Sequence, residues 1–212
     1  MPEIKPIETI YNGYRFRSRL EARWAVFFDE AHIEYQYEPE GYVGLWGDWY
    51  LPDFYLPQFD IYCEVKPTDE ALRKDAWKII GVVDGQQTPI SDAGLLLLGN
   101  IPYSPGKHPV FCCLYWDKGV WSTTAAFDIW DDVPELLVDT FRGRQKKKNT
   151  SSYSAFCDFH YFDDPGGDLD RCSVGPTYAD WTYYGDSFWI NCCYKAARQA
   201  RFEHGETPEV SK

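Results

Sequence analysis

The stretch YLPDFYLPQFDIYCEVKP, residues 50–67, decides the fold. It contains two runs rich in aromatic and β-branched residues, and the segment 57–60 between them carries the Pro and Asp that are typical of a turn. This pattern predicts a β-hairpin. With 57–60 as its loop, Asp53 lies directly opposite Glu64, and opposed residues of an antiparallel pair point to one face with Cβ atoms about 4.5–5.5 Å apart.

The predicted hairpin has one polar and one apolar face. Lys66 follows Glu64 by two residues and therefore lies on the same face as Glu64 and Asp53. Two carboxylates this close repel each other, so the pairing requires a cation between them. The opposite face is predicted to be core, and its side chains are Phe54, Leu56, Ile61, Cys63 and Val65.

An Asp, a Glu and a Lys on one face provide hard oxygen ligands for Mg²⁺ or Mn²⁺ with an ammonium group beside them. Such a set is suited to phosphodiester hydrolysis, because the metal binds a phosphate oxygen and activates water while the cation helps to neutralise the transition state. A simpler interpretation is a surface salt bridge in which Lys66 neutralises Asp53 and Glu64. The hairpin alone favours the salt bridge, and the order of the surrounding elements and the arginines around the first helix reverse that preference.

The motif Pro52-Asp53 followed by Glu64-Val65-Lys66 resembles the signature of the PD-(D/E)XK nuclease superfamily. Upstream, RFRSRLEARWAVFF (15–28) and YEPE (37–40) resemble phage-encoded members and the endonuclease subunit of cut-and-paste transposons of the TnsA type. The resemblance covers about the first 100 residues.

This resemblance implies a Mg²⁺- or Mn²⁺-dependent DNA endonuclease. Asp53 and Glu64 would ligate the metal, and the backbone carbonyl of Val65 would be a further ligand. Lys66 would position water or stabilise developing charge. In this superfamily a Glu on the first helix often completes the active site, and Glu21 has that place in this sequence.

The first helix is predicted to begin at Ser18, because Glu21 three residues later completes a capping box. Its apolar stripe consists of Leu20, Trp24, Phe27, Phe28 and Ala31. Glu21 lies at the edge of that stripe. From there it either caps its own helix or leans over the sheet towards the metal.

Arginines surround the start of this helix, at Arg15, Arg17, Arg19 and Arg23. Arginine forks and a helix N-terminus both suit phosphate, so these residues are candidates for nucleic-acid binding. Pairing with Asp29 or Glu30 on the surface is the alternative. A second basic segment, RGRQKKK (142–148), is a further candidate or a solvated linker.

The periodicity predicts the order helix, strand, strand, strand, helix, strand. The strand 33–40 precedes the hairpin, a helix capped by Thr68 or Asp69 follows it to about residue 83, and 94–99 is a buried strand. We therefore expect an α/β fold with a mixed central sheet flanked by helices, the αβββαβ core of restriction-endonuclease-like proteins. Two further strands, 110–116 and 120–127, extend the sheet or begin a lid over it.

We predict three regions along the chain. Residues 1–130 form the nuclease core, 131–152 a short helix at about 134–141 and the basic linker, and 153–212 an aromatic-rich C-terminal extension or subdomain that ends in a helix at about 190–203. The segments 41–49 and 84–92 are expected to be a loop and a turn-rich connection.

The C-terminal third contains Cys157, His160, Cys172 and Cys192, and the spacing of the first two suits Zn²⁺. A clean second CxxC pair is missing, so buried free thiols are the favoured alternative. The odd number of cysteines, 7, argues against a secreted disulfide framework.

Lys and Arg number 21 and Asp and Glu 33, which gives a net charge of −12. Because counterion release by cations drives non-specific DNA binding, any DNA contact must use local basic patches. No apolar run is long enough to span a bilayer, and we expect a cytoplasmic protein. The resemblance to phage-encoded nucleases implies a bacterial host or a phage-infected cell.

Two rival functions remain. The charge also suits a non-catalytic acidic interaction protein that imitates DNA or inhibits a basic partner, and an RNA-directed nuclease is the second rival. The expected partner is DNA, with a homodimer or another protein partner left open, and no membrane.

Overall fold

The computed structural model describes residues 6–83, 88–101, 110–116, 119–130, 133–139 and 188–202. The strands of its main sheet are β3 (Gln36–Tyr37), β6 (Phe54–Leu56), β7 (Ile61–Val65), β8 (Leu95–Leu98), β9 (Val110–Trp116), β10 (Gly119–Trp130) and β11 (Val133–Asp139). The helices are α1 (Arg19–Glu30), α2 (Asp69–Val83), α3 (Pro89–Ala93) and α4 (Phe188–Gln199). Two small hairpins pair β1 (Thr9–Tyr11) with β2 (Tyr14–Phe16), and β4 (Tyr42–Val43) with β5 (Trp49–Tyr50).

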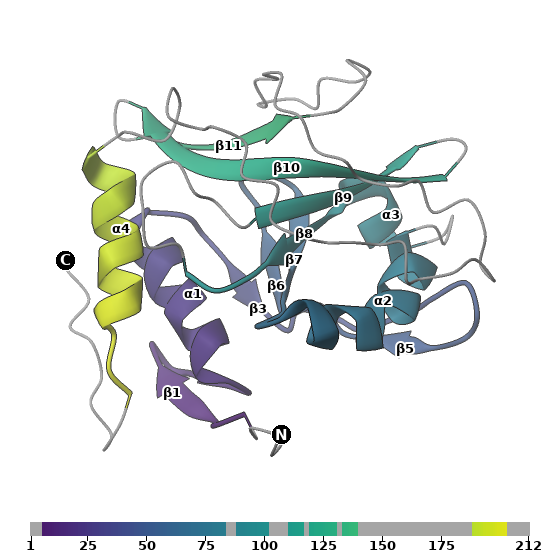
Figure 1. Cartoon of the computed structure of the whole chain (residues 1–212), viewed down its shortest axis with the longest axis horizontal. Helices are drawn as coiled ribbons and strands as arrows, with labels where there is room; N and C mark the ends of the chain where they lie inside the picture. Colours follow the sequence, from purple (N-terminus) through teal and green to yellow (C-terminus); the bar gives the residue numbers. More distant parts are fainter. Residues whose placement is uncertain are drawn as a thin grey trace.

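These elements form a mixed α/β fold in which helices pack against a mixed sheet (Figure 1). The strand order in the sheet is β11-β10-β9-β8-β7-β6-β3. Strands β7 and β8 are parallel, and the other neighbouring pairs are antiparallel. The expected α/β class is thereby confirmed, and β9 and β10 extend the sheet.

The predicted hairpin is confirmed together with its register. Phe54 pairs with Cys63, and Leu56 pairs with Ile61. The side chains of the predicted core face all lie in one apolar cluster with α1 and α4. Every residue of β7 is buried, so this strand lies at the centre of the molecule.

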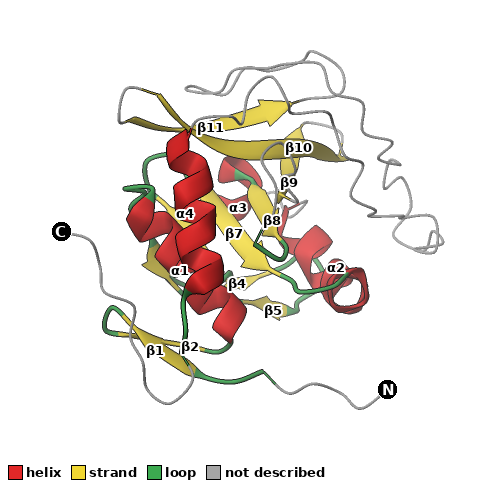
Figure 2. Ribbon diagram, turned by 60° about the vertical axis from the view of Figure 1, so that its left-hand side comes forward, coloured by secondary structure: helices red, strands yellow, loops and turns green. Residues whose placement is uncertain are grey.

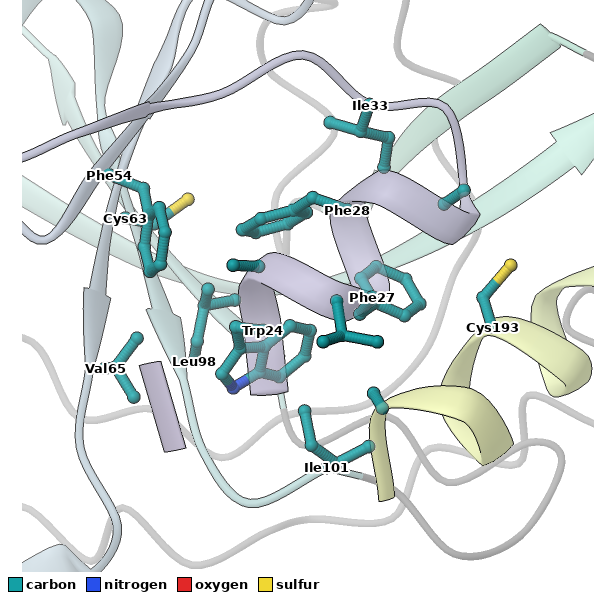
Figure 3. Close-up of a cluster of buried hydrophobic side chains, with 14 of the residues drawn as sticks. Trp24, Phe27, Phe28, Ile33, Phe54, Cys63, Val65, Leu98, Ile101 and Cys193 are labelled. Carbon is teal, nitrogen blue, oxygen red and sulfur yellow. The ribbon is translucent and has the colours of Figure 1, made fainter. Parts of the chain in front are cut away.

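Helices α1 and α4 lie side by side over one face of the sheet (Figure 2). Phe28 of α1 points towards Phe54 of the hairpin, and Trp24 lies beside Leu98 (Figure 3). Phe27 stacks on Tyr194 of α4 with ring centroids 4.5 Å apart. The final helix is thus confirmed, and it completes the same core as the first one.

The other face of the hairpin is not a free polar surface, and this part of the prediction is wrong. Tyr62 belongs to a second apolar cluster, which α2 and α3 build with Leu95 and Leu97 of β8. The parallel pairing of β7 with β8 explains why this face is covered, because parallel strands are usually buried by helices on both faces of the sheet. The acidic side chains on that face are therefore buried rather than exposed.

Three local predictions also need correction. Residues 133–139 form strand β11 and not a helix, because β10 offers them a complete antiparallel ladder that overrides local helical propensity. The expected turn-rich segment contains α3, which Thr88 caps by accepting a hydrogen bond from the Ser91 amide at 3.2 Å. The expected loop 41–49 contains β4 and leads into β5.

The division at residues 130 and 152 stays a prediction. Strand β11 continues the sheet beyond residue 130, while residues 140–187, with the basic segment 142–148, lie outside the described residues. No helix in the described ranges has the length and apolar character needed to cross a membrane.

The aromatic core around β6 can be tested by a truncation. Phe54 is fully buried, and its ring contacts those of Phe16, Phe28, Tyr35 and Tyr37. Phe54→Ala should lower the free energy of unfolding by about 3–5 kcal/mol, because it leaves a cavity between α1 and the sheet. Urea unfolding measures this loss. Ile10→Ala is the control, since Ile10 is 70% exposed and should change stability by only about 0.5 kcal/mol. Equal losses in the two variants would contradict the packing described.

Candidate active site

Asp53 lies immediately before β6, where the ladder with β7 ends. Its Oδ2 accepts a hydrogen bond from the Val65 amide at 2.7 Å. The β6–β7 ladder ends at the pair of Phe54 and Cys63, and beyond it the Asp53 side chain supplies the acceptor for the Val65 amide. The carboxyl group is held tightly, with only 8% of the residue exposed.

Glu64 is on β7 and is 5% exposed. Its Oε2 accepts a hydrogen bond from the Tyr50 hydroxyl at 2.7 Å, and its Oε1 lies 2.9 Å from Lys66 Nζ. Lys66 Nζ also donates to Asp75 Oδ2 of α2 at 2.5 Å. The result is a chain of polar contacts that runs from β5 through β7 to α2.

The structure therefore brings Asp53, Glu64 and Lys66 together, as the register predicts. Of the simpler interpretation, the ion pair of Lys66 with Glu64 is present, while the second carboxylate that Lys66 contacts is that of Asp75 and not that of Asp53. It is not a surface salt bridge, because Glu64 is buried. The chemical roles proposed for these residues remain predictions.

Both acids have a raised pKa. Burial raises the pKa of Asp53 well above 3.8, and the negative charges of Glu64 and Glu21 raise it further. The Val65 amide and the Lys66 ammonium act in the opposite direction with smaller effect. Burial also raises the pKa of Glu64, against the lowering effect of Lys66 and of the Tyr50 hydroxyl. A cation bound next to these two carboxyl groups would therefore stabilise their charged forms, which burial disfavours.

Lys66 is held in its charged form. Burial by itself lowers the pKa of its ammonium, but the charges and hydrogen bonds of Glu64 and Asp75 outweigh burial and raise the pKa above 10.5. A permanently protonated amine is suited to stabilising negative charge and is not suited to removing a proton from water.

Glu21 caps its own helix, which is the first of the two interpretations given for it. Its Oε1 lies 2.6 Å from Ser18 Oγ, while its Oε2 accepts from the Tyr37 hydroxyl at 2.7 Å and from the Arg17 amide at 3.1 Å. The side chain is buried, and its charge contributes to the raised pKa of Asp53. Glu21 is thus near the site while being fully occupied by hydrogen bonds.

The described residues contain no group of three or more His, Cys, Asp or Glu side chains placed to hold a metal. Asp53 and Glu64 would therefore supply two carboxylates, and the Val65 carbonyl is the further protein ligand that we predict. This set fits Mg²⁺, which commonly uses one or two carboxylates and takes its other ligands from water and substrate phosphate. Two buried acids with raised pKa values also fit, because a bound cation favours the deprotonated form that burial disfavours.

The predicted arginine patch is only partly available. Arg15 pairs with Glu8, and Arg17 Nε lies 2.6 Å from Glu38 Oε1. These pairs differ from the Asp29 and Glu30 pairs given as the alternative. Arg19 and Arg23 are both half-buried on α1. Their binding of nucleic acid stays a prediction.

The zinc hypothesis falls largely outside the described residues. Cys157, His160 and Cys172 are not among them. Cys192 is an exposed free thiol on α4, and its neighbour Cys193 is buried in the main core.

Two residues of the site were missed from sequence, Tyr50 and Asp75. The helical periodicity could have indicated Asp75. Leu72 and Ile79 are buried on α2, and spacings of three and four residues place Asp75 on the same face of the helix. No sequence signal indicated Tyr50, because its contact with Glu64 depends on the path of the β4–β5 hairpin.

Comparison of this chain with family models, curated proteins and solved structures gives no match in any of the three.

The raised pKa of Asp53 makes a prediction about stability. A folded-state pKa above the unfolded value stabilises the protein at low pH, and this contribution is lost as pH rises through the raised pKa. Asp53→Asn keeps an oxygen for the Val65 amide but has no charge. It should therefore be more stable than the wild type at high pH and lose less stability as the pH rises above 3.8, the ordinary pKa of an aspartate. Urea unfolding in EDTA at a series of pH values measures how the free energy of unfolding of each protein depends on pH.

Asp60→Asn is the matched control. Asp60 is exposed in the turn of the same hairpin, where its Oδ1 accepts a hydrogen bond from the Tyr55 hydroxyl at 3.0 Å. An Asn oxygen can accept the same bond. If Asp53→Asn has the same pH slope as the wild type and Asp60→Asn, the buried-acid description is wrong.

Proposed function

We propose that this protein is a divalent-metal-dependent endonuclease that hydrolyses DNA phosphodiester bonds. Asp53 and Glu64 are the metal-binding residues of its active site in this proposal. The observation that supports it most is the burial of two acids on neighbouring segments of one hairpin, with the Lys66 ammonium 2.9 Å from Glu64 Oε1. Buried acids with raised pKa values destabilise a fold, and such groups are concentrated at functional sites.

The order of the elements supports the proposal further. The succession α1, β3, β6, β7, α2 and β8 has the order of the restriction-endonuclease-like core, and we propose that core for this chain. The acids lie at the hairpin of β6 and β7, where the PD-(D/E)XK motif places them. The aromatic-rich C-terminal extension belongs to the same proposal.

In this proposal Asp53 and Glu64 would hold Mg²⁺ or Mn²⁺, which would polarise the phosphate and lower the pKa of a bound water. Asp53 is oriented by the Val65 amide and Glu64 by the Tyr50 hydroxyl, so hydrogen bonds fix the positions of both carboxyl groups. Lys66 stabilises the negative charge that develops on the phosphate. Hydrolysis joins the water oxygen to phosphorus, breaks one P–O bond and transfers a proton to the leaving oxygen.

Asp75 and Glu21 are not among the principal metal ligands in this proposal, and each has an accessory role. Asp75 positions the Lys66 ammonium from α2, through the contact at 2.5 Å. Glu21 is an accessory ligand or proton acceptor only if it gives up its contacts to Ser18 and Tyr37.

The acidic interaction protein remains the second candidate. It is favoured by the net charge of −12 and by the pairing of Arg15 and Arg17 within the chain. A binding protein of this kind has no need for two buried acids beside a lysine. Calorimetric titration with Mg²⁺ or Mn²⁺ separates the two candidates, since only the nuclease requires a metal at Asp53 and Glu64.

The catalytic assignment can be tested with the same pair of variants. Asp53→Asn should lower Mg²⁺-dependent cleavage by at least about 100-fold, because it removes a charged metal ligand. Asp60→Asn should cleave like the wild type. The assay offers plasmid, linear, single-stranded and branched DNA with Mg²⁺, Mn²⁺ or EDTA, and matched RNA substrates test the RNA-directed alternative. Equal cleavage by Asp53→Asn and the wild type would rule the assignment out.

A further inference from the structure

A cavity lies at the C-terminal end of α1. Its volume is about 490 Å³, and its walls come from the β1–β2 turn, the end of α1, residues 32–36 and the turn between β6 and β7. The charged groups of this lining are the carboxylates of Asp29 and Glu34, and the His32 ring accompanies them. No Lys or Arg of the described residues lines it. The cavity is therefore suited to a positively charged group and not to a phosphate.

Local backbone geometry builds two of these walls. The Asn-Gly pair at 12–13 has φ angles of 45° and 83°, which are typical of the two-residue type I′ turn of a hairpin. His32 has a φ of 55° and ends α1 in a Schellman motif, in which the Ile33 amide donates to the Phe28 carbonyl at 2.8 Å. Both chain reversals contribute residues to the lining of the cavity.

The Asp29 carboxyl group is half-buried and has only neutral hydrogen-bond partners among the described residues. Its Oδ2 accepts from Asn12 Nδ2 at 3.4 Å and from the Tyr35 hydroxyl at 3.5 Å, and the Tyr11 hydroxyl also donates to this group. None of the described residues forms an ion pair with it. Burial raises the pKa of Asp29 above 3.8, against the lowering effect of these hydrogen bonds, and the charge of Glu30 raises it further. A bound cation would favour the charged form of this carboxyl group.

The end of α1 adds to the negative potential of the cavity. The last turn of this helix contains Asp29 and Glu30 and no basic residue. Because the helix macrodipole places partial negative charge at the C-terminus, cations stabilise that end of a helix and acids do not. A cation bound beside Asp29 would relieve this unfavourable arrangement.

Two tyrosine rings supply an aromatic wall. The ring centroids of Tyr14 and Tyr35 are 5.8 Å apart, and their planes are inclined at 44°. Both residues line the cavity, and Tyr14 is 37% exposed. A guanidinium group is planar, stacks on aromatic faces and presents paired N–H donors to a carboxylate, whereas an ammonium group is a compact point charge. The carboxylate and the rings together favour guanidinium over ammonium.

We propose that this cavity binds a guanidinium group, which pairs with Asp29 and stacks on Tyr14. An arginine side chain of a partner protein and a small guanidine compound present the same chemistry to it. This inference is independent of the nuclease proposal, since Asp29 lies about 12 Å along α1 from Glu21, the residue of this helix that is near the candidate active site.

An NMR titration of the full chain tests the inference without metal or nucleic acid. The probes are butylguanidine, butylamine and the neutral butylurea, which share one alkyl chain, and the side-chain amide signals of Asn12 report on the cavity. Butylguanidine should bind at least about tenfold more tightly than butylurea, and also more tightly than butylamine. Asp29→Asn should weaken butylguanidine binding about tenfold, and Tyr14→Leu, which tests the ring independently of the carboxyl group, about threefold.

Asp92→Asn is the matched control. Asp92 is an exposed acid of α3, which packs on the other face of the sheet, and its replacement changes the net charge by the same amount as Asp29→Asn. This variant should bind butylguanidine like the wild type. An equal loss of affinity in Asp92→Asn and Asp29→Asn would reveal a general effect of net charge and overturn the proposal.

Absence of saturable butylguanidine binding would overturn the proposal, as would equal affinity for butylguanidine and butylurea or equal affinity of the wild type and Asp29→Asn. Equal affinity for butylamine would overturn the choice of a guanidinium group. The peptide acetyl-Gly-Arg-Gly-amide distinguishes the two sources of that group. Binding of the peptide at least as tight as that of butylguanidine assigns the cavity to an arginine of a partner protein, and weaker binding assigns it to a small guanidine.

Discussion

The hydrogen bond from the Val65 amide to Asp53 Oδ2 is the contact on which the site depends. It closes the hairpin beyond the last backbone pair of the ladder, that of Phe54 and Cys63. The price of this closure is a carboxylate placed inside the protein, close to Glu64. A side chain that only ended the ladder could be an amide or a hydroxyl. An acid at position 53 therefore supports a functional role for this side chain.

Burial of β7 on both faces gives these acids their properties. Helices α1 and α4 cover one face, and α2 and α3 cover the other, so water has little access to Glu64. In such surroundings charges interact more strongly than they do at a surface. Lys66 offsets part of the negative charge, yet it is shared with Asp75, so the acids together exceed the positive charge available to them.

Local signals in the sequence were sufficient for much of the fold. The Pro-Gln-Phe-Asp turn fixed the register of the hairpin, and Ser18 and Thr68 marked the first turns of α1 and α2. The misread parts depend on contacts between distant segments. Strand β11 exists through its pairing with β10, and the cover over Glu64 exists because β8 is parallel to β7. The Tyr50 contact has the same origin and could not be read from periodicity.

The packing of α4 on α1 has a consequence for protein synthesis. Trp189 Nε1 donates to the Glu30 carbonyl across 159 residues of sequence. At the ribosome, elongation proceeds at about 5–20 residues per second, so the apolar stripe of α1 emerges roughly 8–30 seconds before its cover. During that interval the nascent chain exposes Phe27 and Trp24, which makes this stripe the surface that a chaperone would shield first.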